Sequence, residues 1–363
     1  MISLSPAAVN GRVQADARRG RGRAPVAAAL RLAVAGLVHD HVWNLLAQFA
    51  ATGQTRAVAV ADAHPPLVER AQREYGFEAV VPAPGDLFAH RPDLVLCCTS
   101  NAATAAVVEA CADHGVAVLV EKPLAANLAQ ARRIAAAAAR ASIPVMCNWP
   151  TAWDAGIQYA AGQIADGALG SLYTLRYRAA HAGPREIGCS PFFYSWLYDA
   201  EANGAGALMD YCCYGAALAG WLLDLPDLVS GVKGRLVKTD IPVEDNAVLL
   251  LQYPGCFALA EASWTQVGHR PYGFQALGPR AGLVADAGRL LLVDEAAPDG
   301  VPVDVPALPP GRRNGPEYFV DCLRAGRAPE GLCSLEVACR AQRILEAGLI
   351  SSRTGAAVAP RLL

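Results

Sequence analysis

Residues 93–123 read DLVLCCTSNAATAAVVEACADHGVAVLVEKP and contain two short apolar runs separated by a helical pattern. The runs at 93–98 and 116–120 predict strands buried on both faces, because neither run alternates apolar with polar residues. Residues 102–114 predict the connecting helix, which ends at Gly115. A strand, a helix and a second strand in this order are typical of two parallel strands in an α/β domain.

The same alternation continues on both sides of this stretch. Further strands are predicted at 31–35, 56–61 and 143–147, and further helices at 41–51, 65–75 and 128–140. The sequence therefore predicts a Rossmann-type, doubly wound parallel sheet within residues 31–150. Residues 1–30 are rich in arginine and are expected to form a flexible N-terminal arm.

The pattern changes after residue 150. Longer, often alternating strands are predicted at 171–180, 229–238, 246–253 and 256–265, and shorter ones at 273–277, 282–286 and 289–293. Helices are predicted at 154–166, 206–223, 316–325 and 334–350. Residues 151–363 are thus expected to form an α+β domain with a large, mainly antiparallel, open-faced sheet. Because the open face needs a cover, a homodimer or homotetramer is expected.

Composition excludes several classes of function. The formal net charge of −2 argues against a nucleic-acid partner. No run of about 18 uninterrupted apolar residues occurs, so no membrane span is expected. The 11 cysteines form no CxxC motif and no zinc-type spacing, which indicates small buried side chains in a reducing, cytoplasmic compartment.

The first predicted turn lies where dinucleotide-binding proteins carry GxGxxG. It reads GLVHDH from Gly36 to His41, so only the first glycine is present, and Val38 and His41 replace the others. A phosphate held at the N-terminus of the following helix is the preferred interpretation, with His39 also in the loop. No metal site is expected, because His39 and His41 have no third ligand nearby in the sequence.

Asp62 ends the second strand, 26 residues after Gly36. A carboxylate at this place bonds the ribose hydroxyls of NAD and repels the 2′-phosphate of NADP, so NAD is the expected cofactor. A helix-capping aspartate is the alternative interpretation.

Two further groups of residues suggest chemistry. Lys122 is one of three lysines in the chain and lies at the carboxyl end of a predicted parallel strand, where α/β sheets bind ligands. Asp210 and Tyr214 are four residues apart, so in a helix they share a face. The plain alternatives are a solvated lysine before a proline turn and a tyrosine that only packs.

With these residues considered together, the chain resembles the glucose–fructose oxidoreductase, inositol dehydrogenase and rhizopine-catabolism family, called Gfo/Idh/MocA. Residues 93–124 resemble its strand–TPN–helix–strand–EKP stretch, with Ser100 where proline is usual, and residues 204–223 resemble its GGGALxDxGxH helix. Residues 164–176, 244–264 and 316–359 resemble its later segments.

The resemblance implies roles for individual residues. Lys122 is expected beside the nicotinamide and the reacting carbon, and Asp210 is expected to orient the substrate or a neighbouring acid/base group. Tyr214 stands where a catalytic histidine is usual, and a nearby ammonium would let it exchange a proton with an alcohol. Thr99, Asn101 and Glu121 are expected to contact the cofactor, and Asn148 to contact the substrate.

The resemblance and the segment 181–203 together suggest the substrate. This segment is rich in aromatic and polar residues that suit contacts to a sugar or polyol, among them His181, Arg185, Tyr194 and Trp196. A well-packed loop is the alternative for any one of them. The expected function is an NAD(P)-dependent oxidoreductase of sugars, polyols or related cyclic alcohols. Two alternatives stay open: a glycosidase or lyase that oxidises a sugar transiently with tightly held NAD, and a non-catalytic dinucleotide-binding regulator.

Overall fold

Six parallel strands form the first sheet, in the order β3-β2-β1-β4-β5-β6, in the computed structural model, which describes residues 28–268, 273–286 and 288–363. They are β1 Leu30–Ala35, β2 Thr55–Ala61, β3 Ala79–Val81, β4 Leu94–Cys97, β5 Ala117–Glu121 and β6 Val145–Asn148. The predicted Rossmann-type sheet is confirmed, and only the three-residue β3 was missed. The expected arm lies, as far as residue 27, outside the described residues.

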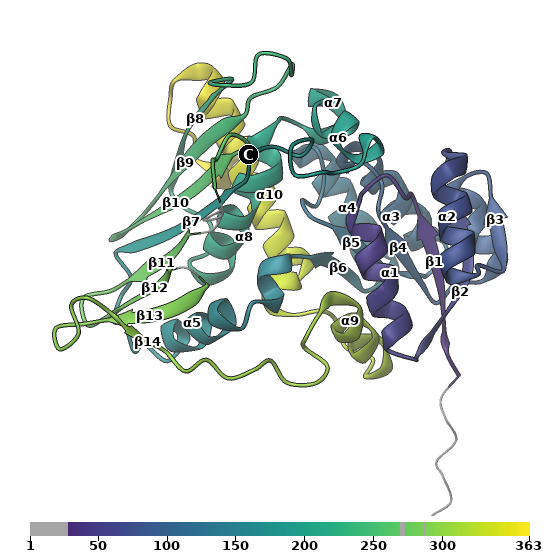
Figure 1. Ribbon diagram of the computed structural model, residues 1–363, viewed down its shortest axis with the longest axis horizontal. Helices are drawn as coiled ribbons and strands as arrows, with labels where there is room; N and C mark the ends of the chain where they lie inside the picture. The colour runs from purple at the N-terminus through teal and green to yellow at the C-terminus, as the bar shows by residue number, and fades with distance from the viewer. Residues whose placement is uncertain (1–27, 269–272, 287) are drawn as a thin grey trace, which may run out of the picture.

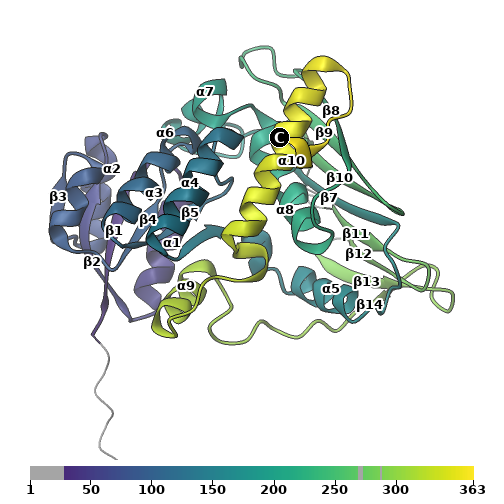
Figure 2. The same cartoon turned by 180° about the vertical axis from the view of Figure 1, so that it is seen from behind.

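Helices cover both faces of this sheet. Helix α1 (His41–Ala51) lies on one face, and α3 (Thr104–Asp113) and α4 (Leu128–Ala141) lie on the other (Figures 1 and 2). Helix α2 (Pro65–Tyr75) connects β2 to β3. The strand order reverses between β1 and β4, and ligands of such sheets bind at this switch point, outside the carboxyl ends of the strands.

Eight strands form the second sheet, in the order β14-β13-β12-β11-β7-β10-β9-β8. They are β7 Thr174–Ala180, β8 Leu228–Gly234, β9 Asn246–Tyr253, β10 Cys256–Ser263, β11 Gly273–Leu277, β12 Gly282–Asp286, β13 Arg289–Val293 and β14 Val301–Pro302. Only β7 and β10 pair in parallel, which confirms the mainly antiparallel prediction.

Helices α5 (Ala155–Ala165), α8 (Cys213–Leu222) and α10 (Leu335–Thr354) lie along one face of the second sheet, and no helix of the described residues covers the other face (Figures 1 and 2). Alternation along β9 explains this arrangement, because Leu249 and Leu251 are fully buried whereas Leu250 points outward and is 40% exposed. Helix α9 (Gly315–Arg324) lies near α1 of the first domain.

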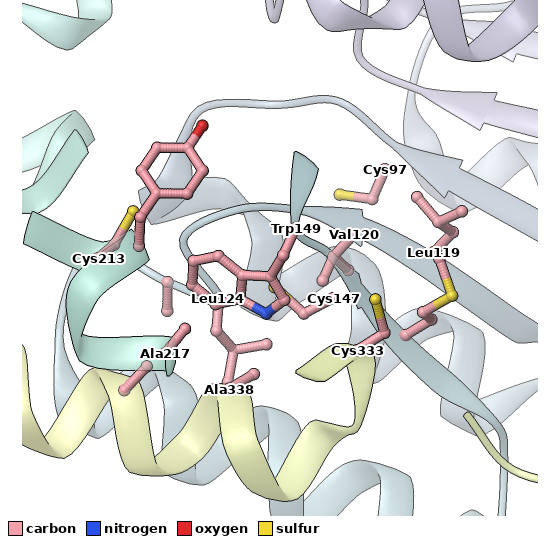
Figure 3. Close-up of a cluster of buried hydrophobic side chains, with 14 of the residues drawn as sticks. Cys97, Leu119, Val120, Leu124, Cys147, Trp149, Cys213, Ala217, Cys333 and Ala338 are labelled. Atoms are coloured by element: carbon pink, nitrogen blue, oxygen red, sulfur yellow. The ribbon is translucent and has the colours of Figure 1, made fainter. Parts of the chain in front are cut away.

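A cluster of buried side chains connects the two domains (Figure 3). Trp149, just after β6, packs among residues of β5, β6, α8 and α10, including Val120, Cys147, Cys213 and Ala338. All 11 cysteines are free and nine are buried, as expected for small apolar side chains. No helix in the described ranges is long and apolar enough to cross a membrane.

Two segments differ from the prediction. No helix is predicted in the segment 181–203, yet it contains α6 (Pro191–Leu197) and α7 (Ala200–Asn203), started by the capping side chains of Ser190 and Asp199. The strand predicted at 229–238 ends at Gly234, because the Asp245 carboxylate accepts the backbone N–H groups of residues 236–238 and removes them from the ladder.

Candidate active site

A buried ion pair lies between the two domains. Lys122 follows β5 directly, and its Nζ lies 2.7 Å from Asp210 Oδ1 and 3.2 Å from the Asp210 carbonyl oxygen. Lys122 is only 2% exposed and Asp210 only 4%. Burial alone would lower the pKa of Lys122, but the charge and hydrogen bond of Asp210, with smaller contributions from Cys213 and Tyr211, together outweigh burial and hold that pKa above its usual value. The lysine is therefore charged and held in one position.

Two tyrosines contact the charged end of Lys122. Its Nζ lies 4.9 Å from the ring centroid of Tyr214 and 5.7 Å from that of Tyr211. The predicted helix over 206–223 begins with a π-helical turn, Leu208–Cys212, before α8. Such turns are frequent at functional sites. The structure thus brings Lys122, Asp210 and Tyr214 together, as the sequence predicted.

Trp264 was missed by sequence reasoning. It directly follows β10, is fully buried, and its Nε1 donates to Asp210 Oδ2 at 3.1 Å. Lys122 and Trp264 therefore hold both carboxylate oxygens of Asp210. Nothing in the sequence pattern reveals this contact, because Asp210 and Trp264 are 54 residues apart.

His181 lies beside this cluster. Its ring centroid is 4.7 Å from that of Tyr211, and its Nδ1 accepts the backbone N–H of Gly183 at 2.8 Å. Burial lowers the pKa of His181, and the charge of Asp210 offsets this only in part. A neutral imidazole with its proton on Nε2 follows from the bond to Nδ1.

The other predicted substrate residues have partners elsewhere. Arg185 is exposed and pairs with Asp240 at 2.5 Å, so the structure does not bring it to Lys122. Trp196 Nε1 lies 3.4 Å from the Val38 carbonyl oxygen, and its ring packs against His39. Tyr194 lies on α6, and its ring contacts the ring of Tyr198, the residue that directly follows this helix. The polar groups of Arg185 and Trp196 thus each have a partner within the protein, and their contact with a substrate stays a prediction.

The turn after β1 fits a dinucleotide in two respects. Gly36 has φ 81°, and a Cβ there would lie 2.6 Å from Thr99 Cγ2, so only glycine permits this close approach of the β1 and β4 ends. Asp40 precedes α1 but makes no capping bond, since it binds the Ser190 N–H and hydroxyl instead. Asp40 therefore leaves the N-terminus of α1 open to an anion, apart from the His41 N–H, which donates to His39 Nδ1 at 3.3 Å.

Two residues predicted to bind cofactor also have structural roles. The Asp62 carboxylate accepts the backbone N–H groups of Leu37 at 2.6 Å and of His64 at 2.8 Å, and it also lies 2.8 Å from His64 Nδ1. It stands beside the Gly36 turn, as predicted, but it also holds that turn in shape. Asn101 is buried and its amide donates to Asn203, which connects the first domain to α7.

The histidines of the turn meet a third group. Glu121 Oε2 lies 3.1 Å from His41 Nδ1, and its Oε1 accepts the Asn148 amide at 2.6 Å. His39, His41 and Glu121 each offer a ligand atom within 4.8 Å of the others. Burial, with the nearby charges of His41 and Lys122, lowers the pKa of His39 well below its usual value. The two histidines have no third candidate ligand nearby in the sequence, as stated above, but folding brings Glu121 to them from 80 residues away. Asn148, expected at the substrate, binds Glu121 instead.

Two family models match the chain. One, described as an oxidoreductase family with an NAD-binding Rossmann fold, matches residues 30–149, and the other, the GFO/IDH/MocA C-terminal domain, matches residues 157–289. D-apiose dehydrogenase of Paraburkholderia graminis is 34% identical over 136 residues, covering 37% of this chain and 35% of that protein. Myo-inositol dehydrogenase Hyg17 of Streptomyces leeuwenhoekii is 29% identical over 126 residues, covering 35% and 39%. The matches thus span well under half of these relatives.

Solved structures share the whole fold. Levoglucosan dehydrogenase, in complex with NADH and levoglucosan, gives a TM-score of 0.79 at 19% identity, over 91% of this chain and 99% of that one. An Agrobacterium radiobacter oxidoreductase, in complex with NAD+, L-tartaric acid and magnesium, gives 0.77 at 20% identity, over 92% and 99%. Aldose-aldose oxidoreductase of Caulobacter crescentus, complexed with glycerol, gives 0.76 at 22% identity, over 91% and 99%.

Proposed function

The chain belongs to the GFO/IDH/MocA family of oxidoreductases, and on that premise we propose that it oxidises or reduces a sugar, polyol or related cyclic alcohol with a nicotinamide dinucleotide. The observation that carries the proposal is the buried Lys122–Asp210 pair with Tyr214 against it, at the carboxyl end of β5. A charged lysine beside a phenol is suited to moving the proton of an alcohol.

Tyr214 is the residue that takes the hydroxyl proton when the alcohol is oxidised and returns it in reduction. The Lys122 ammonium, 4.9 Å from the Tyr214 ring, favours the anionic form of the phenol electrostatically. Asp210 holds the ammonium in place, and Trp264 in turn holds Asp210. When bound, the nicotinamide accepts or supplies the hydride that completes the reaction.

The dinucleotide would be held at the switch point of the first sheet. The residues proposed to hold it are Gly36, Val38, His39, His41, Asp62, Thr99, Asn101, Glu121 and Lys122. Asp62 at the end of β2 favours NAD, because its carboxylate repels the 2′-phosphate of NADP. Titration with both cofactors tests this preference, and tighter binding of NADP would contradict it.

The surroundings of Lys122 support a polyhydroxylated substrate. His181, Tyr211 and Tyr214 combine flat apolar faces with polar tips, a combination suited to sugar rings and their hydroxyl groups. The relatives named for D-apiose and myo-inositol are consistent with this class of substrate.

One experiment tests the proposal. Mass spectrometry identifies any dinucleotide that copurifies, and a panel of sugars and polyols is then assayed by the absorbance of reduced nicotinamide. We expect net dinucleotide reduction with at least one cyclic alcohol. Bond cleavage without net dinucleotide turnover would indicate the glycosidase or lyase reaction instead, and inertness toward the whole panel together with no dinucleotide binding would contradict the proposal.

A further inference from the structure

We propose that His39, His41 and Glu121 bind a divalent transition-metal ion of the zinc class. Two imidazoles and one carboxylate are the protein ligands of many catalytic zinc sites. The three residues come from the β1–α1 turn and the end of β5, and among the described residues they form the one group of this kind.

The ligand atoms are close to the spacing that a metal requires. Ligands about 2.0–2.1 Å from zinc in a tetrahedron lie about 3.4 Å apart. His41 Nδ1 and Glu121 Oε2 are already 3.1 Å apart, and all three ligand atoms lie within 4.8 Å of one another. Side-chain movements of up to about 1.4 Å therefore close the site, and His39 then gives up the 3.3 Å hydrogen bond that its Nδ1 accepts from the His41 N–H.

The groups around the three residues are those that orient metal ligands. Asn148 donates to Glu121 Oε1 at 2.6 Å, and Trp153 in turn donates to Asn148 Oδ1 at 2.9 Å. Glu121 Oε2 faces His41 and also accepts the Lys122 backbone N–H at 3.3 Å. His39 is packed between Phe193 and Trp196 at centroid distances of 4.5 and 5.7 Å. Hydrogen-bonded carboxylates and an apolar shell around the imidazole are typical of metal sites.

The site is open on one side. The His41 side chain is 39% exposed, so an ion has a way in and a free coordination position remains for water or a ligand oxygen. The same turn and Glu121 belong to the dinucleotide contacts proposed above. One consequence rests on the proposed function: the ion and NAD compete for binding to the same residues.

The test uses the full chain stripped of dinucleotide, with Co²⁺ as a spectroscopic probe and Zn²⁺ in competition with a chromophoric chelator. We expect stoichiometric binding, with visible absorption typical of low-coordinate Co²⁺. Glu121→Gln, which preserves size, and His41→Gln, at a half-exposed position, should each weaken binding by at least about tenfold, and Asn148→Ala by about 10- to 100-fold. His64→Gln is the matched control, because His64 also contacts a carboxylate, Asp62, at 2.8 Å but belongs to no group of three candidate ligands within the described part of the chain.

Absence of binding to the unmodified protein, or equal binding by Glu121→Gln and His41→Gln, would overturn the metal site. Adding NAD to the metal-loaded protein should release the ion. If NAD binds without releasing it, the competition is wrong and the metal site stands. If NAD does not bind at all, the proposed function fails, while the direct metal titration is unaffected.

Discussion

Lys122 and Asp210 carry opposite charges where almost no water reaches them, so each depends on the other. Removing one partner of such a pair leaves an uncompensated buried charge. Lys122→Ala should lower the free energy of unfolding by about 3–5 kcal/mol, measured by chemical denaturation. Arg133→Met is the control, because Arg133 pairs with Glu109 at an exposed position and should cost under about 1 kcal/mol. Equal losses of unfolding free energy in the two variants would contradict the proposed dependence of the Lys122–Asp210 pair on its burial.

Tyr214→Phe isolates the hydroxyl, because the ring and its packing remain. If this hydroxyl transfers the proton, kcat should fall about 10²–10⁴-fold while dinucleotide binding and folding persist. Tyr253→Phe is the control, since Tyr253 is equally buried but its hydroxyl donates to the Asp224 carbonyl, away from the site. Steady-state kinetics on the identified substrate decide the question. Normal turnover by the Phe variant would indicate that Lys122 or His181, and not Tyr214, transfers the proton.

At the scale of single elements, the N-terminus of α9 depends on Glu317. Its carboxylate accepts the N–H groups of Gly311 and Arg313, and the Arg313 guanidinium contacts it at 2.6 Å. Arg313 first, and then these backbone bonds, lower the pKa of Glu317 to about 2, although its partial burial acts in the opposite direction. The ionised side chain therefore fastens the loop 311–313 to the helix.

A carboxyl whose pKa is lowered by folding contributes stability above its unfolded pKa of 4.5, and this contribution is lost as the pH falls toward about 2. Glu317→Gln should cost about 1 kcal/mol at pH 7, after allowance for solvent screening at this partly exposed site. The difference from the unmodified protein should shrink below about pH 4.5 and fall under half by about pH 3. Thermal unfolding of both proteins across this range measures it, and a constant difference would contradict the assignment.

The helices and strands show which parts of the structure could be predicted from the sequence. The parallel strands and their helices were predictable, because each follows from local periodicity and turn residues. The π-helical turn at 208–212 was not, because it depends on the Glu244 carboxylate, which lies just before β9, far along the chain, and accepts the N–H groups of Gly206 and Leu208. Lys122 and Asp210 were found through motifs, whereas Trp264 became visible only when folding brought it to Asp210.

At the scale of the whole molecule, the face of the second sheet that carries no helices exposes apolar side chains to solvent. Its outward side chains include Phe257, which is 54% exposed, Leu250 at 40% and Val232 at 67%. In the middle of this face lies the ion pair of Arg176 with Glu261. Exposed apolar side chains on adjacent strands, around paired charges, are typical of a protein–protein interface.

We therefore expect a homodimer or homotetramer that associates through this face, since a twofold axis lets one sheet face cover its own copy. Light scattering at micromolar concentration should show an oligomer, and Phe257→Asp combined with Leu250→Asp should convert it to a monomer by burying charge at the interface. Val80→Asp is the control, because Val80 is 49% exposed on β3 of the other domain. A monomeric unmodified protein, or dissociation of the control as well, would show that this face is not the interface.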